Sequence, residues 1–200
     1  ALFNFMPELR FLKMILNNRA IIPRYVSEYI NYLNINGLYK IIFPMTCFCN
    51  IPFSKINAHI KNYRPYGICL NKADWGVQKG LQPIKYINTH SQLIKDFKES
   101  FKAARSSKKT DEGKILRNYI FSDLIFTKPI RGIMDTRQKP KADTLFQDEC
   151  EWRYVPTFNE NIDIPIVLIE NEAQAVTHNL IYYNEVLRNH KEVWLNFELK

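Results

Sequence analysis

The sequence predicts a single α+β domain, because strand-like and helical patterns alternate along the chain. Apolar runs at 41–49 and 66–70 have the composition of buried strands. Helical spacing dominates about 90–127, and a further strand-like segment follows at 148–155. Strands on both sides of the helical stretch need each other to form a sheet. We therefore expect one domain over 1–200 with a helical insertion.

The first third of the chain is predicted to contain two strand–helix pairs. Residues 2–5 form a short strand, and Pro7 stands where proline commonly opens a helix. Leucine and isoleucine at helical spacing continue this helix until it ends near residues 17–18. The run 41–49 is expected to be buried on both faces, and Ser54 can cap a helix that reaches residue 63.

The rest of the chain holds the insertion and the later strands. Two helices, 91–104 and about 112–125, flank a polar break at 106–111. A short helix is expected around Trp75 and a late one over 179–188. Further strands are predicted at 66–70, 83–87, 129–133, 148–155 and 193–199.

The composition is that of an ordinary globular protein, with 46% hydrophobic and 14% aromatic residues. No apolar run approaches the roughly 20 residues that cross a bilayer, so no membrane partner is expected. The four cysteines fit neither a disulfide framework nor a zinc knuckle, which favours a reduced, cytoplasmic protein. The four histidines lie on separate segments without metal-ligand spacing, so no metal site is expected: His59, His90, His178 and His190.

The charge is unevenly distributed along the chain. Up to Ala142 there are 24 basic and 9 acidic residues, whereas 4 basic and 11 acidic residues follow. The basic excess is densest in the helical insertion and just after it, and it includes Lys108, Lys109 and Lys114. Positive charge of this kind can bind nucleic acid or an acidic protein partner, or it can form a solvated surface that binds nothing.

The segment from Asp148 to Pro156 carries the most informative side chains. As a strand, it would place Glu149, Glu151 and Arg153 on one face. Because two carboxylates this close repel each other, one of them should have a raised pKa, unless a cation, a ligand or water relieves the repulsion. Such a pair of carboxylates could bind a polyol such as a ribose, or it could stabilise a positively charged transition state. The alternative is an exposed strand on which Arg153 neutralises its neighbours.

Four segments in the same order, 44–52, 66–72, 80–87 and 148–156, resemble the bacterial abortive-infection AbiGi family. The resemblance covers most of the chain and is most specific in the last segment. It implies the antitoxin half of a phage-resistance pair. The implied partner is a cognate toxin or another defence protein, with nucleic acid as an alternative. Lys108, Lys109 and Lys114 are the candidate contacts for either partner.

That family in turn distantly resembles ADP-ribosyltransferases, which implies a split, mostly antiparallel sheet that binds NAD. The resemblance gives Glu151 the catalytic position, with Glu149 as the second carboxylate. Asn4, where related sequences would carry histidine, would then contact the cofactor together with Phe5, Tyr66 and Arg153. The alternative function is therefore NAD-dependent mono-ADP-ribosyl transfer to nucleic acid or protein; a pure binding protein needs no cofactor.

Overall fold

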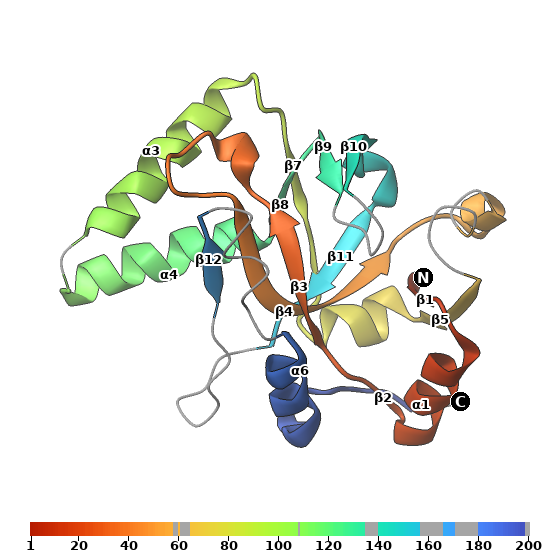
Figure 1. The fold of residues 1–200 in the computed structure, drawn as a ribbon. Coiled ribbons are helices and arrows are strands. Elements are labelled where there is room, and N and C mark those ends of the chain that lie inside the picture. Colours follow the sequence, from red (N-terminus) through yellow and green to blue (C-terminus); the bar gives the residue numbers. More distant parts are fainter. Residues whose placement is uncertain are drawn as a thin grey trace.

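The computed structural model describes residues 1–57, 60, 65–107, 109–134, 140–156, 166–170 and 180–198 (Figure 1). Its strands are β1 (Leu2–Met6), β2 (Ala20–Ile21), β3 (Arg24–Tyr29), β4 (Lys40–Cys49), β5 (Tyr66–Leu70), β6 (Gln82–Pro83), β7 (Lys85–Ile87), β8 (Thr127–Pro129), β9 (Arg131–Met134), β10 (Lys141–Leu145), β11 (Glu151–Tyr154), β12 (Val167–Ile169) and β13 (Leu195–Asn196). The α-helices are α1 (Leu9–Asn18), α3 (Gln92–Ser106), α4 (Asp111–Ile125) and α6 (Leu180–Asn189). Five shorter helical turns connect them: η1 (Asn31–Leu33), η2 (Phe53–Lys55), η3 (Lys72–Val77), η4 (Phe146–Glu149) and η5 (Lys191–Val193).

The largest sheet is organised around β4, and the predicted α+β class is confirmed. β3 pairs with residues 40–45 of β4, and β11 pairs with residues 46–49. β12 pairs with residues 40–42, while β1 meets β4 only where Phe3 lies opposite Cys49. β5 and β6 extend this sheet beyond β1 and β11, and every pairing within it is antiparallel.

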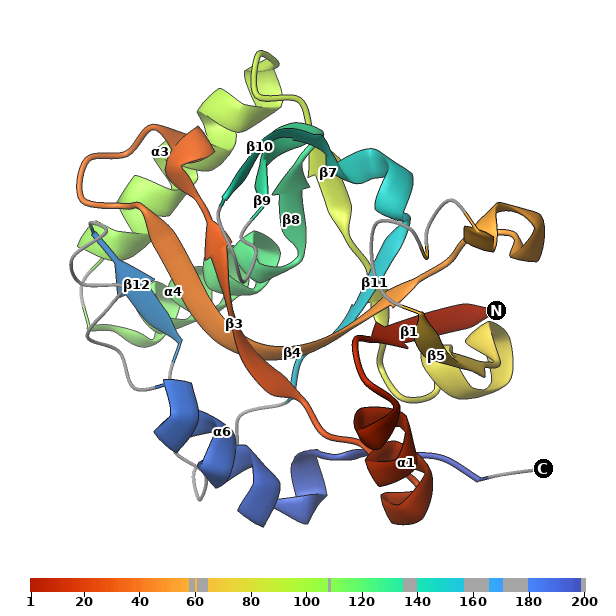
Figure 2. The same ribbon diagram turned by 45° about the vertical axis from the view of Figure 1, so that its right-hand side comes forward.

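Side chains of β4 alternate between two hydrophobic layers, and eight of its ten residues are buried. Phe43 and Met45 pack into the layer that contains the buried side chains of α3 and α4. On the opposite face, Phe48 packs with Ile15 of α1, and Ile42 packs with Leu187 of α6. Figure 2 shows the same division, with α3 and α4 on one side of β4 and with α1 and α6 on the other. The prediction of a strand buried on both faces is confirmed.

Helices α3 and α4 form close to the residues at which two helices were predicted, 91–104 and about 112–125. Thr110 caps the start of α4, because its hydroxyl accepts a hydrogen bond from the backbone N–H of Gly113 at 3.2 Å. The buried side chains of the two helices belong to one hydrophobic cluster with Phe43: Ile94, Phe97, Phe101, Ala104, Ile120, Leu124 and Ile125. Because these side chains cover one face of the sheet, α3 and α4 are part of the core.

Several predicted boundaries differ from the structure. The strand over 83–87 is divided at Ile84 into β6 and β7, and β7 pairs in parallel with β8. The last predicted strand is shortened to β13, since Val193 ends a helical turn. The helix predicted from Ser54 to residue 63 begins as a turn, and its second half lies largely outside the described residues. None of the helices that the structure describes is long and apolar enough to span a membrane.

Candidate charged site and cavity

The strand predicted from Asp148 begins only at Glu151. Residues 146–149 form a helical turn, and Cys150 adopts a left-handed backbone conformation with φ 44°. This conformation interrupts the pleat, so strand alternation does not extend back to Glu149. Glu149 therefore approaches Glu151 from the turn, while Cys150 is exposed instead of sharing a face with Trp152.

Five ionisable side chains from four parts of the chain form a buried charged cluster. Its members are Glu28 of β3, Lys128 of β8, Glu149 of η4, and Glu151 and Arg153 of β11. The exposed fractions of these side chains run from 0% to 17%. The alternative of an exposed strand face is therefore wrong, because the side chains of all three carboxylates are largely buried.

Arg153 is the most deeply buried member, with 0% of its side chain exposed. Its Nε donates to Glu151 Oε1 at 2.6 Å, and its Nη2 donates to Glu28 Oε1 at 2.6 Å. Its Nη1 donates to the backbone carbonyl of Ile125, which ends α4. Arg153, which was predicted to contact a cofactor, thus ties β11 to β3 and α4 within the core.

Lys128 supplies the second cation of the charged cluster. Its Nζ lies 2.7 Å from Glu151 Oε2, 3.2 Å from Glu149 Oε2 and 3.4 Å from Glu28 Oε1. The ammonium also lies 4.7 Å from the centre of the Phe146 ring, a favourable cation–π distance. Both oxygens of Glu151 are thus engaged by cations.

These contacts reverse the predicted effect on the pKa of Glu151. Burial alone would raise that pKa, but Arg153 and Lys128 lower it well below its usual range. The predicted exception applies: nearby cations relieve the repulsion between the carboxylates. For Lys128, burial lowers the pKa, but the carboxylates of Glu151, Glu28 and Glu149 raise it well above its usual value. Glu151 and Lys128 therefore remain charged at neutral pH.

Neutral groups close the cluster on its other sides. The hydroxyl of Tyr86 accepts a hydrogen bond from the backbone N–H of Glu151 at 3.0 Å. Burial raises the pKa of this Tyr86 hydroxyl, and it raises the pKa of Cys47 as well. Burial and the nearby Glu149 and Glu151 raise the pKa of Cys49 to about 12. Neither thiol is therefore a thiolate nucleophile at neutral pH.

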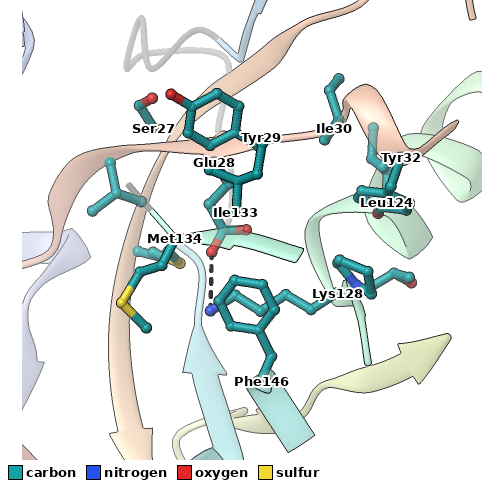
Figure 3. Close-up of a pocket in the computed structure, with 14 residues that line it drawn as sticks. Ser27, Glu28, Tyr29, Ile30, Tyr32, Leu124, Lys128, Ile133, Met134 and Phe146 are labelled. Atoms are coloured by element: carbon teal, nitrogen blue, oxygen red, sulfur yellow. Dashed lines mark ion pairs between the residues drawn. The ribbon is translucent and has the colours of Figure 1, made fainter. Parts of the chain in front are cut away.

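A cavity of about 200 Å³ lies beside the charged cluster (Figure 3). Glu28 and Lys128 are the members of the cluster that line it. Most of the remaining lining is apolar or aromatic: Val26, Tyr29, Ile30, Tyr32, Met45, Leu124, Pro129, Ile133, Met134 and Phe146. A second hollow, whose lining includes His90 and Arg131, shares only Ile133 with the first.

The predicted cofactor-binding residues do not converge on one surface. Phe3 pairs with Cys49, which pairs with Glu151, so these three side chains share a face of the sheet. Asn4 belongs to the opposite face by alternation, and its side chain donates to the carbonyl of Cys47 at 2.8 Å. Tyr66 packs against the hydrophobic cluster of that opposite face. Among the four predicted contacts, Phe5 and Arg153 alone extend toward the face that carries Glu151.

The candidate partner-binding lysines lie away from the charged cluster. Lys109 and Lys114 are exposed at the start of α4, whereas Lys108 lies outside the described residues. Glu28 and Lys128 were missed from sequence because they lie 100 residues apart and belong to no motif with Glu151. The only signal was general: a charged residue in a strand flanked by aromatic side chains, as Glu28 is by Tyr25 and Tyr29, is a candidate for a buried ion pair.

With this geometry in place, comparison with known proteins assigns the family. Residues 19–199 match the family described as "Putative abortive phage resistance protein AbiGi, antitoxin". A relative from Lactococcus lactis subsp. cremoris, "Abortive phage resistance protein AbiGi", is 30% identical over 198 residues, which is 90% of this chain and 79% of that protein. No solved structure matches the chain significantly. The chain belongs to the AbiGi abortive phage resistance family, so the predicted family and its phage-defence role are confirmed.

Proposed function

We propose that this protein is the antitoxin of a two-gene phage-defence pair and acts by binding a partner protein in the cytoplasm. The charged cluster supports a structural role for Glu151. Both of its oxygens are engaged, 4% of its side chain is exposed, and its contacts join strands of the core. Such a group holds a fold together and leaves recognition to the surface.

The surface that best fits partner binding is the outer side of α4. Ile115 and Tyr119 are each 68% exposed and lie one helical turn apart, and Leu116 is 37% exposed beside them. Lys109 and Lys114 flank this apolar stripe at the start of the helix. Exposed aromatic and aliphatic anchors bordered by charge are typical of protein interfaces. This surface carries the proposal and favours a protein partner with an acidic rim over nucleic acid.

Co-expression with the neighbouring gene tests this function directly. Wild-type protein is expected to rescue growth of cells that express the neighbouring toxin and to form a complex with it. Tyr119→Ala combined with Lys114→Glu should lose the complex while the protein remains folded. Rescue by this double variant at wild-type strength, in cells that contain equal amounts of protein, would place the toxin-binding surface elsewhere.

ADP-ribosyl transfer remains the competing function, with Glu151 and Glu149 beside the cavity as its carboxylates. That function would require Glu151 to release at least one cation before it could contact a ribose. It would also require Asn4 and Tyr66, which lie on the opposite face of the sheet, to approach Glu151. Release of nicotinamide from NAD would reveal this activity.

A further inference from the structure

We infer that the cavity beside the charged cluster binds the arginine or lysine side chain of a partner polypeptide. Its volume of about 200 Å³ falls below the roughly 300–1,000 Å³ of small-molecule pockets and suits a single side chain. The identity of the partner rests on the proposed function, whereas the chemistry of the cavity rests on its own lining.

The polar groups at the cavity wall favour a cation over an anion. Glu28 and Lys128 are the charged residues among those that line the cavity. Lys128 already contacts all three carboxylates, and Arg153 has no exposed side-chain surface. Neither cation is therefore open to a phosphate or carboxylate that enters the cavity.

Glu28 supplies an acceptor for the incoming cation. Arg153 and Lys128 both contact its Oε1, and within the described part of the chain its Oε2 has no partner. The side chain of Glu28 is 17% exposed, and Figure 3 shows its carboxylate among the residues that line the cavity. A guanidinium or ammonium group can therefore donate to Oε2 without breaking either existing ion pair.

A second, independent observation comes from Tyr32. Its ring lines the cavity, and its buried hydroxyl lacks a hydrogen-bond partner among the described residues. A buried hydroxyl without a partner costs free energy, which a bound donor or acceptor recovers. Burial raises the pKa of Tyr32 well above its usual value, so this hydroxyl is neutral and available as an acceptor.

The remaining walls suit the aliphatic stem of a basic side chain. Met134, Ile133 and Phe146 line the cavity close to Lys128 and Glu28 (Figure 3). Arginine and lysine bury their methylene groups against such surfaces while the charged end makes polar contacts.

The test measures the binding of small probes to the full chain by NMR titration. N-acetyl-arginine methylamide and butylguanidinium are expected to give saturable shifts at the residues that line the cavity, whereas pentanoate does not. Met134→Trp fills the cavity, and Glu28→Gln removes the charge of the acceptor. Each variant should bind the capped arginine with an affinity about tenfold or more below that of wild type. Val77→Trp, at an exposed position outside the cavity, is the matched control and should leave the affinity unchanged.

Three results overturn the inference. The first is saturation of the same residues by pentanoate. The second is equal binding of the capped arginine by Met134→Trp and Val77→Trp, both folded by circular dichroism. The third is a titration in which neither cation saturates. If butylguanidinium binds but the capped arginine does not, the inference that the cation belongs to a polypeptide is overturned. If Met134→Trp loses the capped arginine but still neutralises the toxin, the cavity is not part of the toxin interface, while the antitoxin function stands.

Discussion

The charged cluster and the outer side of α4 are both rich in cations, but the structure uses them in opposite ways. Arg153 and Lys128 are paired with carboxylates within 2.6–3.4 Å, beneath helices and strands. Lys109 and Lys114 are exposed beside the apolar side chains of Ile115 and Tyr119. Exposure, and not the density of charge in the sequence, therefore separates the charged groups that stabilise this fold from those available to a partner.

The largest expected effect is on folding and comes from Arg153. Arg153→Met should lower the free energy of unfolding by about 3–5 kcal/mol, because Glu28 and Glu151 would each lose a buried partner. Urea denaturation measures this loss. The matched control is Arg131→Met, which breaks an exposed ion pair with Asp143 and should cost no more than about 1 kcal/mol. Similar losses in the two variants would mean that the charged cluster does not hold the fold.

A smaller effect is expected on binding and comes from Tyr119. Tyr119→Ala should weaken toxin binding by about 2 kcal/mol if this exposed ring is an interface anchor. The free energy of unfolding of the Tyr119→Ala variant should differ from that of wild type by less than about 0.5 kcal/mol, since the ring makes little contact with the core. Calorimetric titration with the purified toxin measures the first value. Tyr182→Ala, at a ring that is 58% exposed on α6, is the control and should bind normally.

The buried charged cluster should also make the stability of the protein depend on pH. The pKa of Glu151 is lowered in the folded state, so its contribution is complete above the unfolded pKa of about 4.3 and is lost as the pH falls. This group alone should remove about 1.4 kcal/mol per pH unit below that point. Urea denaturation between pH 6 and pH 3, at about one-unit steps, should show a shallower decline for Glu151→Gln than for wild type. Parallel curves would contradict the low pKa.

The smallest effect is expected from the exposed lysines. Lys109→Glu combined with Lys114→Glu should slow association with an acidic partner and reduce its dependence on salt, while stability changes little. Stopped-flow association at low and moderate salt provides the measurement. Identical rates and salt dependence in wild type and variant would mean that these lysines are solvated and do not contribute to association with the partner.

How far the sequence predicts this molecule depends on how local each feature is. The apolar run of β4 and the helical spacing of α3 and α4 are local patterns, and they predicted these elements correctly. Glu28 and Lys128 join Glu151 only through tertiary contacts, which no motif encodes. The left-handed conformation of Cys150 was equally hidden, because residues other than glycine seldom adopt it. The face on which Asn4 lies depends on strand register, which was unknown before the pairing was seen.

A structural Glu151 and a catalytic Glu151 give opposite results in an assay of nicotinamide release from NAD by purified wild-type protein, with Glu151→Gln measured in parallel. We expect no release from either protein, because Glu151 stabilises the fold and the protein acts by binding. Release by wild type, together with its loss in a folded Glu151→Gln variant, would contradict this proposal and make the carboxylate catalytic.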